Sequence, residues 1–74
     1  MKKEIKLVEK EVARRLRVAR TKADMSQQDL ADACGVDRKT INRIENGHFS
    51  PNLNTLTRIC SVMDTKISVF LKGI

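Results

Sequence analysis

Two short helical patterns separated by a glycine constrain the fold of this chain more than any other feature. They lie within residues 26–47, which read SQQDLADACGVDRKTINRIENG. Ser26 and Asp29 have the spacing of a capping box and predict the start of one helix, and Gly35 predicts its end. Asp37 then has the position of a cap for the next helix. Two helices joined by so short a turn form a helix-turn-helix unit, in which the first helix fixes the angle of the second.

Further helical patterns flank this unit. Apolar residues recur at steps of three and four across residues 4–23, which predicts a long amphipathic helix that ends near Asp24. Pro51 and Asn52 are typical of a helix start and predict a helix over about 53–63. The apolar face predicted for that helix consists of Leu53, Leu56, Ile59, Cys60 and Met63.

The C-terminal tail fits two periodicities. Residues 67–74 place apolar side chains at helical spacing, whereas residues 65–71 alternate as in a strand. We favour a short fifth helix and keep a short C-terminal strand as the alternative. In either form, residues 1–74 are enough for only one domain, with the helix-turn-helix at about 27–46 and an extension over residues 1–10.

Composition favours an all-α fold with an aliphatic core. Hydrophobic residues make up 41% of the chain, but its aromatic residues are only Phe49 and Phe70. Leu, Ile, Met and Ala suit helices better than sheets. We expect Phe49 to plug the core from its loop, and Cys34 and Cys60 to fill small buried positions. Two thiols and one histidine do not make a zinc site, so no metal or cofactor is expected.

The charge of the chain points to a polyanionic partner. Fifteen Lys and Arg residues exceed nine Asp and Glu residues, which gives a net charge of +6 and favours nucleic acid. No apolar run approaches the ~18 residues that span a bilayer, so we expect a cytoplasmic protein without a membrane partner. We expect no enzyme, because the sequence lacks a phosphate-binding glycine loop, a metal-ligand cluster and a local Cys-His pair.

One face of the second helix of the unit, predicted over 38–46, carries groups that can read DNA bases. Ile41 and Ile44 face the core, which leaves the opposite face exposed. Guanidinium groups fork onto guanine and carboxamides onto adenine in the major groove, and a good bidentate pair contributes about 1–3 kcal/mol of discrimination. The predicted base contacts on that face are Arg38, Lys39, Asn42 and Arg43.

Polar residues at both ends of the unit are candidate phosphate contacts. Gln27 and Gln28 lie in the first turn of its first helix, where free backbone N–H groups and the positive end of the helix dipole attract an anion. Thr40, Asn46 and His48 are candidates at the other end of the unit. Such contacts position a protein on DNA without reading its sequence.

The chain resembles the Xre-type, lambda-repressor-like family of helix-turn-helix regulators over about residues 12–72. The resemblance implies a compact bundle of five helices, base contacts at the four residues given above and a phosphate contact at Gln27. It also implies an ion pair between Arg20 and Glu45 that braces the second helix of the unit. The residues that carry the resemblance are Ser26, Gln27, Leu30, Ala31, Gly35, Val36, Ile41, Ile44, Glu45, Asn46, Gly47, Pro51, Leu53, Leu56 and Ile59.

The sequence also departs from the family pattern. Asp24 and Asp64 stand where the family favours glycine, so both turns are expected to be strained or reshaped. Lys66 replaces the usual small cap of the fifth helix, and residues 1–10 lie outside the pattern. A related antitoxin branch of the family ends in a dimerising strand, which keeps the strand alternative open.

These observations predict a sequence-specific regulator of transcription, a repressor, that binds double-stranded DNA as a homodimer. Two recognition helices would enter successive major grooves, with half-sites about 34 Å apart on a near-palindromic operator. The alternative is an antitoxin-type interaction module that masks a toxin and regulates its own operon. The predicted dimer surface consists of Leu56, Met63, Ile67, Phe70 and Ile74.

Overall fold

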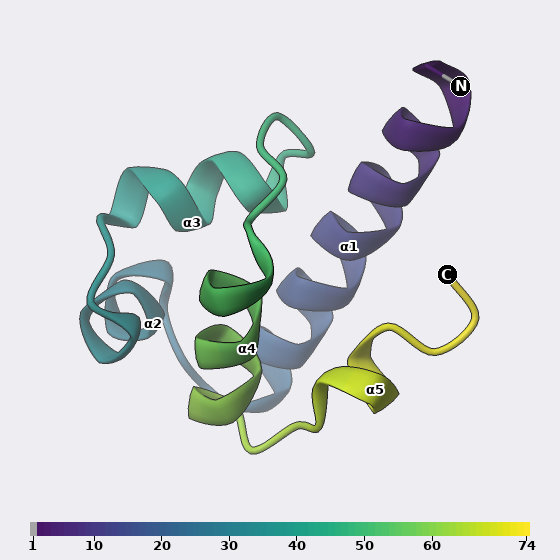
Figure 1. Cartoon of the computed structure of the whole chain (residues 1–74). Coiled ribbons are helices and arrows are strands. Elements are labelled where there is room, and N and C mark those ends of the chain that lie inside the picture. Colours follow the sequence, from purple (N-terminus) through teal and green to yellow (C-terminus); the bar gives the residue numbers. More distant parts are fainter. Residues whose placement is uncertain (1) are drawn as a thin grey trace.

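The computed structural model describes residues 2–74, and Met1, which the predicted domain includes, lies outside them. All the regular secondary structure in this described part is helical (Figure 1). The predicted all-α class with five helices is confirmed, and the tail forms a short helix instead of a strand. The helices are α1 (Lys2–Lys22), α2 (Gln27–Cys34), α3 (Arg38–Glu45), α4 (Leu53–Val62) and α5 (Ile67–Phe70).

A single aliphatic core joins the helices. Each helix contributes residues at steps of three or four, because that spacing keeps side chains on one face. Full burial of one Leu or Ile side chain contributes about 1.5–3 kcal/mol, so the bundle depends on this cluster. Its buried members include Leu16 from α1, Leu30, Ala31 and Cys34 from α2, Ile41 and Ile44 from α3, Ile59 and Cys60 from α4, and Phe70 from α5.

The ends of α2 are set by the residues that the sequence predicted. The Asp29 amide donates to Ser26 Oγ at 2.9 Å, and the Ser26 amide donates to Asp29 Oδ2 at 3.0 Å, which completes the capping box. Gly35 ends the helix with φ 70°, in the left-handed region that glycine adopts without strain. Asp37 occupies the cap position of α3, but its side chain makes no capping hydrogen bond, so that part of the prediction is wrong.

Two aspartates take over the role that glycine usually has at helix ends. Asp24 and Asp64 adopt φ 56° and φ 53°, and each lies two residues after the end of its helix, α1 or α4. The turns keep their hydrogen bonds: the Met25 amide donates to the Arg20 carbonyl at 3.2 Å, and the Thr65 amide to the Cys60 carbonyl at 2.9 Å. The predicted strain is therefore confined to the backbone angles of the two aspartates.

Burial corrects three predictions about apolar residues. Phe49 does not plug the core, because it remains 42% exposed, and Leu53 at the start of α4 is 69% exposed. Leu56, Met63 and Phe70 are buried within the single chain, so they are not free to form the predicted dimer surface. Of the other two residues of that surface, Ile67 packs partly against the core and Ile74 is exposed.

The two cysteines lie inside the bundle as expected. Cys34 is 4% exposed and Cys60 is 1% exposed, and both are free thiols. Burial raises the pKa of each thiol, because an apolar surrounding disfavours the thiolate. Across residues 2–74, each helix is either too short or too polar to cross a membrane.

Candidate nucleic-acid interface

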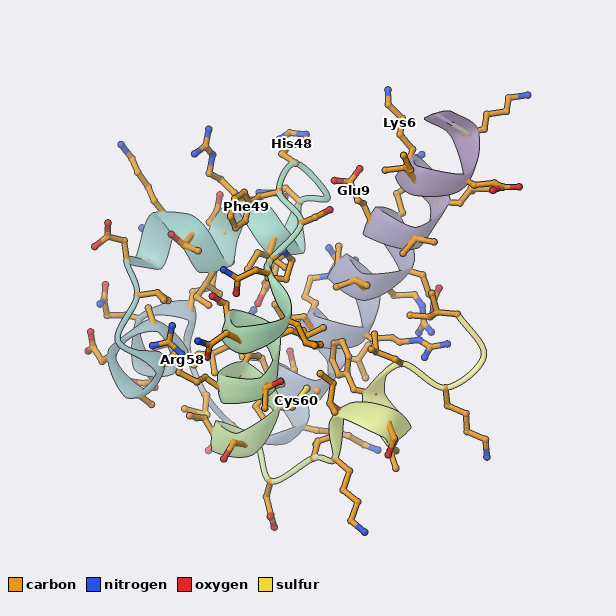
Figure 2. The ribbon with its side chains drawn as sticks, in the orientation of Figure 1. Lys6, Glu9, His48, Phe49, Arg58 and Cys60 are labelled. Atoms are coloured by element: carbon orange, nitrogen blue, oxygen red, sulfur yellow. The ribbon has the colours of Figure 1, made fainter. Side chains whose placement is uncertain are left out.

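The two faces of α3 have opposite characters. Ile41 and Ile44 are 0% and 1% exposed and anchor the helix in the core. The other face is in solvent, and all four predicted base-contacting residues on it are exposed. Figure 2 shows nitrogen-tipped side chains that extend from α3 away from the rest of the bundle. The structure thus brings together, on one accessible surface, Arg38, Lys39, Asn42 and Arg43.

The cations on this surface are available to an external ligand. Within the described part of the chain, Arg38, Lys39 and Arg43 take part in no ion pair and no side-chain hydrogen bond. A guanidinium carries five N–H donors and an ammonium carries three, so this surface offers many donors. Base edges and phosphates both accept hydrogen bonds from such donors.

The amide on the same surface is held by a chain of hydrogen bonds. Asn42 Nδ2 donates to Gln27 Oε1 at 3.2 Å, and Gln27 Nε2 donates to Glu45 Oε1 at 3.1 Å. On its other side, Asn46 Nδ2 donates to Asn42 Oδ1 at 3.0 Å. The chain of hydrogen bonds connects the first turn of α2 to the last turns of α3, and both polar atoms of the Asn42 amide take part in it.

A buried ion pair lies at the base of this chain. Arg20 Nε donates to Glu45 Oε2 at 2.6 Å, and a second nitrogen of the same guanidinium donates to Glu45 Oε1 at 3.1 Å. Glu45 is only 3% exposed, and the Arg20 side chain is 17% exposed. The hydrogen bond to Glu45 raises the pKa of the Arg20 guanidinium above its ordinary value. The ion pair implied by the family resemblance is therefore present, and it braces α3 against α1.

A second arginine of α1, whose role was not predicted from the sequence, supports the C-terminal end of α3. The Arg17 guanidinium donates to the Glu45 carbonyl at 3.0 Å and satisfies an acceptor that the last turn of α3 leaves free. Arg17 lies about one helical turn before Arg20. This spacing of two basic residues is the feature of the sequence that could have predicted the contact.

The predicted phosphate contacts divide into two groups. Gln27 is partly buried and its amide already donates to Glu45, while Gln28 Nε2 donates to Asp32 Oδ1 at 2.8 Å. At this end of the unit the free donors are the first backbone N–H groups of α2, which have no acceptor within the helix. At the other end, Asn46 and His48 are exposed and Thr40 is partly buried.

A family model and similar sequences both match this chain to helix-turn-helix proteins. A family model described as helix-turn-helix matches residues 14–70. The chain is 36% identical over 59 residues to the SPbeta prophage-derived HTH-type transcriptional regulator YonR of Bacillus subtilis, a match that covers 80% of this chain and 55% of YonR. It is 38% identical over 53 residues to an HTH-type transcriptional regulator of Archaeoglobus fulgidus, over 72% of this chain and 75% of that protein. The match thus spans little more than half the length of YonR.

Solved structures share the fold. The clp gene regulator ClgR from Corynebacterium glutamicum superposes with a TM-score of 0.84 at 19% identity, over 86% of this chain and 68% of that one. An HTH_3 family transcriptional regulator from Vibrio cholerae superposes with a TM-score of 0.83 at 27% identity, over 89% of this chain and 37% of that one. The arrangement of α1 to α5 is therefore one that a solved HTH_3 family transcriptional regulator also has.

Proposed function

The chain belongs to the helix-turn-helix family of transcriptional regulators, and from that premise we propose that it represses transcription by binding a specific DNA sequence as a homodimer. The observation that carries the proposal is the exposed face of α3, where three cations that form no ion pair within residues 2–74 surround a hydrogen-bonded amide. That face has the donors and acceptors that major-groove base edges require. Because the proposed ligand is DNA, we place the chain in the cytoplasm.

We assign the residues of the interface two kinds of role. Arg38, Lys39, Asn42 and Arg43 contact bases. The remaining polar groups hold phosphates: the first turn of α2 at Gln27 and Gln28, and at the other end Thr40, Asn46 and His48. Base contacts determine sequence preference, whereas phosphate contacts determine register and salt dependence.

A dimer follows from the small size of the reading surface. An eight-residue α3 presents few side chains to one groove, and two copies about 34 Å apart double the number of bases read. Exposed apolar residues near the C-terminus, Val69 at 60% and Ile74 at 46%, are the candidates for this contact in place of the buried residues. Sedimentation equilibrium tests the dimer, and a monomer on DNA with a single half-site would contradict it.

Selection of bound duplexes from a random DNA pool is the primary test. We expect an enriched, near-palindromic sequence. If the dimer neutralises ~6–8 phosphates, the logarithm of the affinity falls with the logarithm of salt concentration at a slope near −6. A pool without enrichment, or a slope near zero, would refute the proposal.

The role of Arg38 has a sharper test. Arg38→Ala should lose about 1–3 kcal/mol of discrimination at a single base position of the selected duplex. Lys22→Ala, at the far end of α1, removes the same charge and should leave the base preference unchanged. Equal losses of affinity for the selected and a scrambled duplex would show that Arg38 contacts only phosphate.

A further inference from the structure

A row of basic residues follows one face of α1 into the N-terminal extension. At about 100° per residue, its members fall within about 80° of helical arc, and the three acidic residues of the same half-helix lie outside that arc. Figure 1 shows that this half of α1 extends past the other helices. We refer to the row as the α1 basic stripe, and it consists of Lys3, Lys6, Lys10, Arg14 and Arg17.

The α1 basic stripe runs beside the C-terminal end of the recognition helix. A cavity of about 360 Å³ between α1 and the end of α3 is lined by Lys10, Arg14, Arg17 and Asn46, among others. A second cavity, of about 220 Å³, continues it toward the N-terminus between Lys6 and His48. In Figure 2 the side chains of Lys6 and His48 extend on the same side of the molecule. The stripe is thus continuous with the proposed phosphate contacts Asn46 and His48.

The N-terminal half of the stripe has uncompensated positive charge. Among the described residues, Lys3, Lys6 and Lys10 form no ion pair. Arg14 is paired with Glu11 at 2.6 Å. Glu9 lines the second cavity together with Lys6 and Lys10, and its carboxylate accepts a hydrogen bond from Ser50 Oγ at 2.7 Å, so it faces the loop after α3. Three ammonium groups in one row therefore attract an anion with several regularly spaced charges.

The spacing of the lysines matches a nucleic-acid backbone. Seven residues separate Lys3 from Lys10, which is about 10 Å along a helix at 1.5 Å per residue. One DNA strand carries a phosphate about every 3.4 Å along the duplex axis, so a helix segment of this length that runs along the duplex can reach about two to three phosphates. Flexible lysine side chains place their charges on phosphates without requiring fixed base geometry.

We propose that the α1 basic stripe binds the sugar–phosphate backbone of duplex DNA that flanks the segment read by α3. This inference rests on the proposed function and gives a role to the N-terminal extension. The stripe adds affinity that is independent of sequence, and it lengthens the DNA that one chain covers beyond its half-site.

A charge-matched pair of variants tests the inference. The stripe variant carries Lys3→Gln, Lys6→Gln and Lys10→Gln. The control carries the same change at three exposed lysines outside the stripe, so both variants lose three positive charges. Binding to a mixed-sequence 30-bp duplex is followed by fluorescence anisotropy across a salt series. The control lysines are Lys22, Lys66 and Lys72.

We expect the salt slope of the stripe variant to decrease in magnitude by about 2–3 for each bound chain, because each phosphate contact contributes about 0.9. The control should stay within about 0.5 of the unmodified chain. Lys6→Gln alone, which removes one exposed side chain, should lower the slope by about 1. Equal slopes for the stripe variant and the control would overturn the inference.

Duplex length and selectivity separate this inference from the proposed function. The selected sequence in a 30-bp duplex should bind the unmodified chain more tightly than the same sequence trimmed to its base-contacting core, and the stripe variant should lose this gain. Its preference for selected over scrambled DNA should remain. If the stripe variant keeps both the tighter binding to the longer duplex and the preference for selected DNA, only the role of the stripe is refuted. If no sequence is selected from the random pool, the proposed function is refuted, and the salt slopes of the stripe variant and the control still test the stripe.

An anionic membrane is the competing ligand, because Ile5, Leu7 and Val8 on the same half of α1 are exposed apolar residues. Sedimentation with vesicles that contain phosphatidylserine tests it. Loss of vesicle binding by the stripe variant, with its DNA salt slope unchanged, would overturn the inference.

Discussion

Removal of the Arg20 guanidinium should destabilise the chain far more than removal of an exposed one. Arg20→Met leaves the Glu45 carboxylate 3% exposed, with the Gln27 amide as its remaining side-chain donor. Breaking a buried ion pair by removing one partner costs about 3–5 kcal/mol. We expect about 3 kcal/mol, the lower end, because Gln27 still donates and the Arg20 side chain is 17% exposed.

This loss is large relative to the total stability of so small a domain. At roughly 0.05–0.15 kcal/mol per residue, the free energy of unfolding for 74 residues is roughly 4–11 kcal/mol. For a domain of this size, 1 kcal/mol shifts the melting temperature by about 4–8 °C, so Tm should fall by about 12–24 °C. Urea denaturation followed by circular dichroism measures the free energy directly.

Two further variants make the result interpretable. Arg14→Met removes a guanidinium that is 57% exposed and paired with Glu11, and it should change Tm little. The double variant Arg20→Met, Glu45→Met removes both buried charges, and it should recover most of the loss. The reasoning would be refuted if Arg20→Met lowered Tm no more than Arg14→Met does. It would also be refuted if the double variant lost as much stability as Arg20→Met and Glu45→Met lose in sum.

The double variant has a consequence for DNA. Glu45 anchors Gln27, and Gln27 orients Asn42. Arg20→Met, Glu45→Met removes the carboxylate that anchors Gln27, so it should reduce discrimination at the base that Asn42 reads, measured below the melting temperature, while the salt slope stays the same. Unchanged discrimination would show that Asn42 is oriented by DNA alone.

Three other predictions follow from local features. The pKa of Glu11 is about 2, because Arg14 above all donates to its carboxylate, so its contribution to stability is present above pH 4.5 and is lost as the pH falls toward 2. Glu11→Gln should therefore flatten the decrease of Tm between pH 5 and 2, and an unchanged profile would contradict this. The thiols of Cys34 and Cys60 should react with a thiol reagent only as fast as the native chain opens, so immediate stoichiometric labelling would show that they are accessible. Asp24→Gly should raise Tm by a few degrees by relieving φ 56°, with a net gain of about 0.5–1 kcal/mol, and a lower Tm would show that the aspartate is not strained.

Signals confined to one or two helical turns made most of the fold predictable. The capping box of Ser26, the left-handed Gly35 and the cap at Asn52, which accepts from the Thr55 amide at 2.8 Å, each act within four residues. The spacing of apolar residues then indicated which face of each helix packs against the core. The tail was ambiguous because a four-residue helix is too short for one periodicity to exclude the other.

Most of the incorrect predictions concern burial that depends on neighbouring helices. Leu53 and Leu56 lie on the same predicted face of α4, but Leu56 is buried and Leu53 is 69% exposed, because only one of them reaches the other helices. Met63 and Phe70 were assigned to a partner although their own chain covers them. The link from Glu45 through Gln27 to Asn42 was also not predicted, because its members come from different helices and only the tertiary fold brings them together.

Because α3 has one packed face and one solvent-exposed face, most of its proposed DNA-reading residues can change without affecting folding. One of them is an exception. Arg38, Lys39 and Arg43 are exposed and form no ion pair within the described residues, so exchanging them should reprogram the preferred DNA sequence at little cost in stability. Asn42 is different, because its amide is tied to α2 through Gln27. An engineer or a gene duplication that diversifies this regulator can vary three positions independently, whereas the fourth must change together with its partner on the neighbouring helix.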